Sequence, residues 1–286
     1  MFKFLRSQYF WLGVILVASF LVRLYKIDSP IADWHSWRQA DTATVTRNFV
    51  KYGFNPLIPK YDDMSGVSEN PIANPNVYRF VEFPIYNIAV YPFYLIFGVR
   101  DMLHRLVSVL FTLGSIVFLY LICRRYSGVG VSLLSSAVFA FLPFSVFFSR
   151  TTLPEPTFLF FSLGMIYFVD IWIWEGKSSQ GIWGFFFTSL AFLIKPWAIF
   201  FTPPLVYSIL KKTGSFKKSL KYLWIFVLAI LPLIVWRLWI LQSPEGIPAS
   251  NWLMNGDGIR FRPAFWWWII SERLGREIPV RRASWS

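Results

Sequence analysis

Long apolar runs separated by short polar stretches make up most of this sequence. A hydrocarbon core of about 30 Å is crossed by a helix of roughly 20 apolar residues. Runs that approach this length predict membrane spans near residues 8–25, 102–123, 129–147, 156–174, 182–194, 197–210 and 221–241. The pattern therefore predicts an all-α, polytopic membrane protein with about seven transmembrane helices.

A further apolar segment, residues 82–99, is interrupted by Pro84 and Pro92. Because proline removes a backbone hydrogen-bond donor inside a helix, we expect this segment to touch the membrane or to re-enter it without crossing. Residues 27–101 then form one long loop on a single side of the membrane, carrying juxtamembrane helices. A loop of this length is usually functional or disordered, and its many aromatic residues argue against disorder.

Basic residues mark one side of the predicted spans. If residues 82–99 do not cross, that side carries Lys3, Arg6, Arg124, Arg125, Lys177, Lys211, Lys212, Lys217, Lys218 and Lys221. An excess of lysine and arginine in short loops faces the cytoplasm. We therefore expect an integral protein of the plasma (inner) membrane with a cytoplasmic N-terminus. The loop 27–101 and the segment 242–286 would lie on the external, periplasmic side.

Composition agrees with a membrane location. The chain has 286 residues, of which 56% are hydrophobic and 15% are charged, whereas soluble domains carry about 25% charged residues. A net charge of +13 favours nucleic acid in a soluble protein, but here the excess follows the loops, so we expect no nucleic-acid partner. The single cysteine, Cys123, excludes an intramolecular disulfide and a multi-cysteine metal site.

The stretch "WHSWRQADTAT", residues 34–44, brings a carboxylate into the long loop. We expect a helix from Asp41 to Tyr52, ended by Gly53, that lies along the membrane interface with Trp34 and Trp37 anchoring its entry. An acidic residue in the first turn of a helix stabilises it by up to about 1 kcal/mol, which is the structural explanation of Asp41. The functional explanation rests on its surroundings, since Arg38 lies three residues earlier and the helix is expected at the membrane rim.

Other ionisable groups are expected on the same side of the membrane. Each costs about 2.5 to 3.5 kcal/mol at membrane depth and so needs a reason. Arg150 and Glu155, in "SRTTLPEP", either pair with each other or serve a ligand. Lys195 separates two short spans, and it either snorkels to the headgroups or points its ammonium at an anion inside a cavity. The remaining members of this set are His35, Arg38, Glu82 and His104.

Several short motifs carry a resemblance to a known family. They are "WRQADT" at 37–42, "EFPIY" at 82–86, "HRLVS" at 104–108, "SRTTLPEP" at 149–156 and "KP" at 195–196. Their order and predicted sidedness resemble the GT-C superfamily of integral-membrane glycosyltransferases. The nearest groups are bacterial relatives of the aminoarabinose transferases and the dolichyl-phosphate-mannose protein mannosyltransferases. The resemblance extends to about residue 275 and implies one transmembrane domain over 1–286, with 27–101 as the external catalytic loop.

This resemblance implies inverting transfer of a sugar from a polyprenyl-phosphate donor to a glycan, lipid or protein acceptor at the outer face. Asp41 matches the essential aspartate of the family and would be the base, although Thr42 stands where many members have glutamate. A lipid phosphate is already a good leaving group, so one base and some cations suffice. The donor phosphate would be held by Lys195, Arg150 and Arg38, and the sugar, the acceptor or a divalent cation by Glu82, Glu155 and His35.

Two other functions stay open. A transporter or flippase of a lipid-linked saccharide also needs cations at the outer face, but it predicts a polar path through the spans, which are nearly free of charge. The polar tail "REIPVRRASWS" stands where relatives would re-enter the membrane. We therefore also consider an inactive truncated remnant or a partner subunit. His35 and His104 do not have a metal-ligand spacing, so a divalent cation stays a possibility without a motif.

Overall fold

The computed structural model describes residues 7–31, 35–64, 68, 72–250 and 255–276, and only the backbone of residues 273–276. Within this part the chain is helical, and the one pairing of extended backbone is an isolated bridge between Lys60 and Tyr78. The predicted all-α class is therefore confirmed.

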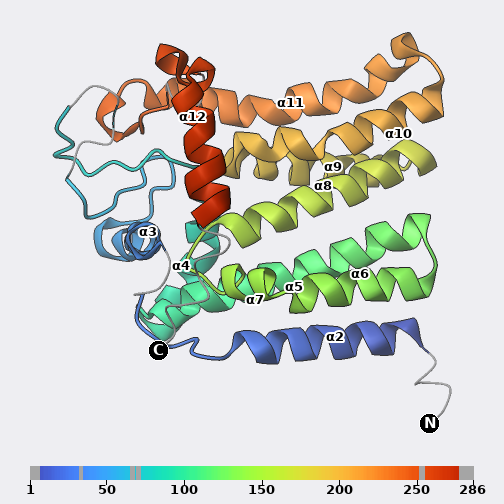
Figure 1. Cartoon of the computed structure of the whole chain (residues 1–286), viewed down its shortest axis with the longest axis horizontal. Coiled ribbons are helices and arrows are strands. Elements are labelled where there is room, and N and C mark those ends of the chain that lie inside the picture. The colour runs from blue at the N-terminus through green and yellow to red at the C-terminus, as the bar shows by residue number, and fades with distance from the viewer. Residues whose placement is uncertain (1–6, 32–34, 65–67, 69–71, 251–254, 277–286) are drawn as a thin grey trace.

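A bundle of roughly parallel helices forms the body of the molecule (Figure 1). Its members are α2 (Gln8–Arg23), α5 (Asp101–Tyr126), α6 (Val129–Phe141), α8 (Glu155–Glu175), α9 (Ser178–Ile194), α10 (Pro203–Thr213) and α11 (Phe216–Ile240). By length and composition, three helices within the described residues, α5, α8 and α11, are able to cross a membrane. Shorter apolar helices, among them α2, α6 and α9, accompany them. The chain is thus a polytopic membrane protein.

Prolines shift two of the predicted spans. Helix α6 ends at Phe141, and a short helix α7 (Pro143–Phe148) follows a break at Leu142. The predicted span 197–210 is divided into a 3-10 helix, η1 (Pro196–Phe201), and α10. Each new helix starts on a proline, which fits the first turn of a helix but not its interior.

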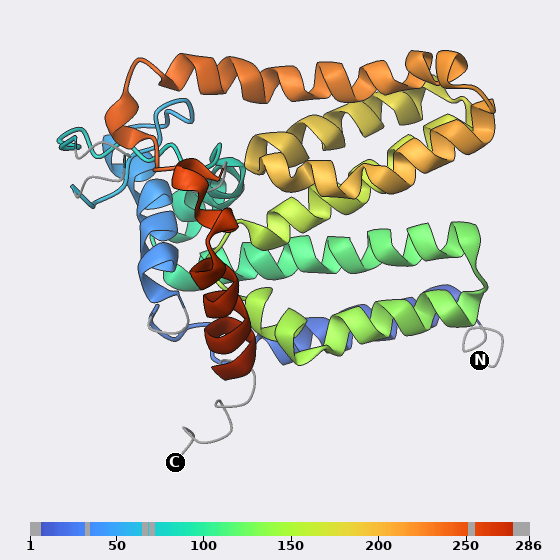
Figure 2. The same cartoon turned by 45° about the horizontal axis from the view of Figure 1, so that its top comes forward.

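The two ends of the bundle differ in what they carry. The connections α5–α6, α8–α9 and α10–α11 lie at one end, and this basic end holds Arg124, Arg125, Lys177, Lys211, Lys212, Lys217 and Lys218. The opposite end holds α3 (Ser36–Tyr52), α4 (Ile85–Phe97) and α12 (Pro263–Trp267), followed by the π-helix η5 (Trp268–Arg276). Helices α3 and α12 run across the bundle axis there (Figure 2). We call it the loop end.

The apolar segment after Pro84 does not lengthen the bundle. It forms α4, a helix of 13 residues with Pro92 inside it, which packs on α3 and α5 at the loop end. Tyr86, Val90 and Tyr94 of α4 make a small apolar core with residues of α5. This arrangement agrees with the expectation that residues 82–99 are not a further span.

Close packing of α8 on α9 sets where their loop-end termini lie. Gly164 of α8 faces Phe187 of α9, and a Cβ at position 164 would come within 2.1 Å of that ring. Small residues allow membrane helices to approach closely in this way. The start of α8, at Glu155, lies beside Lys195, which follows the end of α9 at Ile194.

A buried arginine holds the connection between α2 and α3 on the bundle. Arg105 of α5 donates to the carbonyl oxygens of Ile27 at 3.1 Å and Pro30 at 3.2 Å, and also to that of Ser29. The guanidinium thus occupies backbone acceptors that would otherwise be unsatisfied, and it fixes the path by which the chain approaches α3.

Candidate functional site

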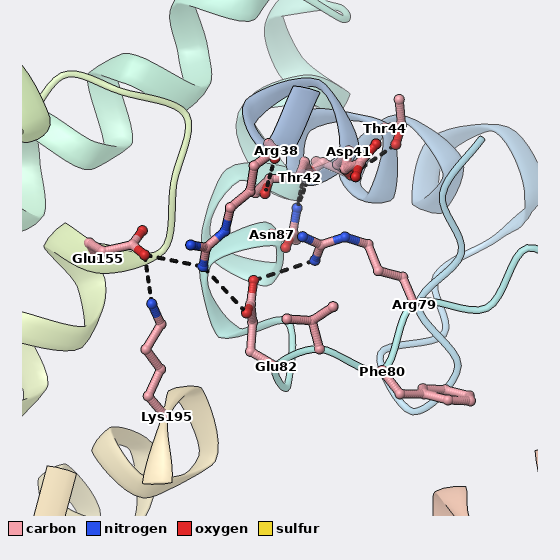
Figure 3. Close-up of polar contacts among 12 residues, drawn as sticks. Arg38, Asp41, Thr42, Thr44, Arg79, Phe80, Glu82, Asn87, Glu155 and Lys195 are labelled. Atoms are coloured by element: carbon pink, nitrogen blue, oxygen red, sulfur yellow. Dashed lines mark hydrogen bonds and ion pairs between the residues drawn. The ribbon is translucent and has the colours of Figure 1, made fainter. Parts of the chain in front are cut away.

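An ion cluster joins distant segments at the loop end. Glu155, the first residue of α8, accepts a hydrogen bond of 2.6 Å from the Lys195 ammonium, just after α9. Arg38 of α3 lies 3.1 Å from the same carboxylate oxygen (Figure 3). Two cations from opposite parts of the sequence therefore share one acidic partner.

A second acidic group extends the cluster. Glu82, in the segment before α4, lies 3.9 Å from Arg38 and 3.4 Å from Arg79. Arg79 and Glu82 are both buried. The segment that carries them is fixed from the bundle, because Arg237 of α11 donates to the carbonyl oxygen of Val81 at 3.0 Å. The three cations and two carboxylates of the cluster leave a net positive charge, which suits an anion.

Asp41 lies on the same helix as Arg38 but does not take part in these pairs. Helix α3 begins at Ser36, five residues before the predicted start, so its first turn contains no acidic residue. The explanation of Asp41 as a residue that stabilises the helix N-terminus is therefore wrong. Its side chain is half-buried and makes no hydrogen bond or ion pair with the described residues.

The electrostatic surroundings of Asp41 favour its protonated form. Burial raises the pKa of this carboxyl above its ordinary value, and the negative charge of Asp63 adds to the rise. Arg79 acts in the opposite direction and lowers the pKa. The net rise makes the ionised Asp41 a stronger proton acceptor than a free aspartate.

Polar side chains add to the apolar contacts that hold α3 against its neighbours. Asn87 of α4 donates to the carbonyl oxygen of Thr42 at 2.7 Å and to the hydroxyl of Thr46 at 2.8 Å. Thr46 is also hydrogen-bonded to Nε2 of His104 at 3.0 Å, and Tyr94 to Nδ1 at 2.8 Å. His104 is thus fully buried and satisfied between helices, a structural role rather than a ligand role.

A further contact sets the register between α3 and the start of α8. Gln39 accepts a hydrogen bond of 2.9 Å from the backbone N–H of Thr152. Beside it, Oγ1 of Thr152, Oγ1 of Thr157 and Oε2 of Glu155 are buried without a hydrogen-bond partner in the described part of the chain. Buried polar atoms are nearly always satisfied, and these three are open to a water molecule or a ligand.

The structure brings some of the predicted site residues together and leaves others apart. Arg38, Glu82, Glu155 and Lys195 form the cluster. Arg150 does not join it: the guanidinium donates to the carbonyl oxygen of Tyr25 and lies 5.8 Å from the centre of that ring. The alternative in which Arg150 and Glu155 pair with each other is therefore wrong, and a phosphate-binding role for Arg150 stays a prediction.

His35 lies at the N-terminus of α3, with a left-handed backbone conformation (φ 57°). Its side chain is exposed, and its role in positioning a substrate also stays a prediction. Trp34, which was expected to anchor this end of the helix, lies outside the described residues. The second predicted anchor, Trp37, is exposed at the surface, as an interfacial residue requires.

Two residues near Asp41 were missed from the sequence. Arg79 is only 6% exposed, and its position three residues before Glu82 was a signal for a buried ion pair. The Tyr61 hydroxyl is buried without a hydrogen-bond partner in the described part of the chain. Burial, together with the charges of Asp63 and Asp41, raises the pKa of Tyr61. No feature of the local sequence distinguishes Tyr61 from the other tyrosines of the loop.

The described residues contain no group of three or more histidine, cysteine, aspartate or glutamate side chains placed to hold a metal ion. The chemistry that the described cluster offers is the binding of an anion by Arg38 and Lys195, next to a half-buried carboxylate.

Comparison with known proteins gives one match. A family model described as dolichyl-phosphate-mannose-protein mannosyltransferase matches residues 84–239, more than half of the chain. The matched region contains Glu155 and Lys195, whereas Arg38 and Asp41 precede it. No curated protein and no solved structure matches.

Proposed function

Because the chain belongs to the dolichyl-phosphate-mannose-protein mannosyltransferase family, we propose that it moves a sugar from a polyprenyl-phosphate donor to an acceptor at the outer face of the membrane, with inversion. Membership of this family makes the chain a membrane glycosyltransferase that uses a lipid-linked sugar. The positive-inside rule supports a cytoplasmic basic end and an external loop end.

The observation that carries the proposal is the shared pairing of Arg38 and Lys195 with Glu155. Two cations on one carboxylate are partly unneutralised, and unsatisfied buried polar atoms lie beside them. A donor phosphate that replaces Glu155 would gain charge-assisted hydrogen bonds from both cations. Arg150 would make a further contact to the donor, and Glu82 and His35 would position the sugar or the acceptor.

Asp41 would act as the general base. In the proposed step the acceptor hydroxyl gives its proton to Asp41, and its oxygen bonds to the anomeric carbon from the face opposite the phosphate. The bond between the anomeric carbon and the phosphate oxygen breaks, and its electron pair leaves with the lipid phosphate. The cations stabilise the departing charge, and the raised pKa of Asp41 supports its role as a proton acceptor.

Binding of undecaprenyl phosphate to the purified chain tests the donor site without knowledge of the sugar. We expect saturable thermal stabilisation of the wild type, because a ligand that binds only the folded state stabilises it. The stabilisation should be lost in Lys195→Ala and in Arg38→Ala and kept in Asp41→Asn.

The matched control is Lys177→Ala, which removes an exposed lysine that is also paired with a glutamate, but at the basic end. It should leave binding unchanged. Equal stabilisation of the wild type and of both cluster variants would remove Arg38 and Lys195 from the donor site.

A further inference from the structure

A polar cavity lies at the other end of α3 from the ion cluster. Its volume is about 200 Å³, below the roughly 300 to 1,000 Å³ typical of sites for drug-sized ligands. The last turns of α3 form one wall, with Asn48 and Tyr52, and the loop that follows forms the rest, with Asn55, Lys60 and Tyr78. A cavity of this size suits a single small ring.

The hydrogen-bonding groups of the cavity are partly used and partly open. The amide nitrogen of Asn48 donates to the Lys60 carbonyl at 3.1 Å and to Asp62 at 2.9 Å, which leaves Oδ1 as an acceptor. Asn55 accepts from the backbone N–H of Leu57 at 3.2 Å, which leaves its NH₂ as a donor. The cavity thus offers both an acceptor and a donor to a ligand.

Aromatic and cationic groups complete the lining. Tyr78 stacks on Phe80 with ring centres 5.4 Å apart, which holds the tyrosine ring in place. The Lys60 ammonium lies 5.6 Å from the centre of the Tyr78 ring and makes no ion pair with the described residues. Tyr52 is 65% exposed at the rim. An exposed aromatic ring beside partly used amide groups matches a pyranose, which has apolar C–H faces and a belt of hydroxyl groups.

The backbone at the end of α3 creates the cavity. Gly53 has φ 99°, a conformation that side-chain-bearing residues rarely adopt. The chain turns away from the helix axis here and folds back, so that Lys60 comes under Asn48. The last residues of α3 line the cavity, among them Asn48 and Tyr52.

The cavity is aligned with Asp41. Asn48 follows Asp41 by seven residues on α3, so the two lie about 10 Å apart along the axis and on nearly the same face. We propose that this cavity binds a sugar residue of the acceptor, next to the unit whose hydroxyl reacts at Asp41. The inference rests on the proposed function, and it makes the acceptor a glycan or glycolipid rather than a protein side chain.

Saturation-transfer NMR on the purified chain in lipid nanodiscs tests the proposal. The probes are methyl α-mannopyranoside, methyl β-N-acetylglucosaminide and a threonine-containing peptide. We expect at least one glycoside to bind the wild type, and its affinity to fall about tenfold in Tyr52→Leu and about fivefold in Asn55→Ala. Both positions are exposed, so the fold should persist.

The matched control is Tyr207→Leu, because Tyr207 is 64% exposed and lies on α10 beside Lys211 of the basic end. It should leave glycoside binding unchanged. The proposal is overturned if neither glycoside binds, if binding is the same in both cavity variants, or if the peptide alone occupies the cavity.

The same measurement in Asp41→Asn separates this proposal from the proposed function. We expect glycoside binding to persist in this variant, because Asp41 does not line the cavity. If the wild type transfers no sugar but glycoside binding persists in Asp41→Asn, the cavity stays assigned as a glycoside site and the transferase function is removed. If transfer depends on Asp41 but Tyr52→Leu changes neither glycoside binding nor the acceptor KM, the transferase function stands and the cavity is not the acceptor site.

Discussion

The two ends of the bundle each hold a carboxylate among cations, but they satisfy it differently. At the basic end, Arg125 binds one oxygen of Asp170 at 2.6 Å, and Tyr126 and Ser208 both donate to the other. At the loop end, Lys195 and Arg38 both bind Oε1 of Glu155, whereas Oε2 is buried without a partner in the described chain.

The difference separates a structural network from a binding site. A polar network with every oxygen engaged fixes helices relative to one another, and it leaves no capacity for a ligand. The Asp170 network ties α5, α8 and α10 in this way. In the Glu155 network, Lys195 and Arg38 keep N–H groups that make no contact with the described residues, and an external anion needs such donors.

The largest effect that we expect at the loop end is that of Asp41→Asn. We expect sugar transfer to fall by about a thousandfold, because loss of a general base typically removes a factor of 10² to 10⁴. The measurement is the release of polyprenyl phosphate from lipid-linked sugar in membranes that contain the variant. Asp63→Asn, which leaves the base in place, serves as the control, and retained transfer in Asp41→Asn would exclude the base role.

The free energy of unfolding should respond more to the Asp170 network at the basic end than to the Glu155 network. We expect Asp170→Asn to lower the free energy of unfolding by about 3 kcal/mol, the lower end for a broken buried ion pair, because Arg125 is partly exposed. Glu155→Gln should lower it by less than about 1 kcal/mol. Thermal unfolding followed by tryptophan fluorescence compares the two. Equal losses would show that the Glu155 network is structural as well.

The affinity for undecaprenyl phosphate should respond to Glu155 and not to Asp170. Glu155→Gln frees Arg38 and Lys195 from their negative partner, so we expect undecaprenyl phosphate to bind about tenfold more tightly. Asp170→Asn should leave the affinity unchanged. Weaker binding in Glu155→Gln would indicate instead that the glutamate contacts the donor directly.

The smallest effect concerns pH and Asp41. Its pKa is raised by folding, so between the ordinary and the raised value the folded chain binds an extra proton, and stability falls as pH rises through that window. Above the window the loss is constant. Asp41→Asn should therefore raise the unfolding midpoint at neutral pH by about 2 °C or less, and by nothing below about pH 4. A lowered midpoint at neutral pH would mean that the carboxylate stabilises the fold.

Much of the fold was predictable because hydropathy is a local property. The apolar runs predicted the helices of the bundle, three of which are long enough to cross a membrane. The predicted basic residues of the described part lie together at one end, whereas Lys3 and Arg6 lie outside the described residues. The start of α3 was misplaced because an aspartate was taken as the start signal. The observed first residue follows His35, whose left-handed conformation no standard capping pattern indicates.

The partners within the site were less predictable because they lie far apart in sequence. Lys195 and Glu155 are separated by 40 residues, and Arg150 and Tyr25 by 125. A motif gives the residue type but not the carboxylate or carbonyl that three-dimensional packing places beside it. Asn87 is a further case, since its side chain contacts residues 45 and 41 positions earlier on the helix that carries Asp41.

The Glu155 carboxylate also competes with external anions for Arg38 and Lys195. An intramolecular partner is present at high effective concentration, so any anion that enters must compete with it. Dilute phosphate in the surrounding water competes poorly, whereas a lipid phosphate confined to the bilayer reaches the site at a much higher local concentration. On the proposed function, Glu155 would thus act as a filter that admits anions delivered by the membrane.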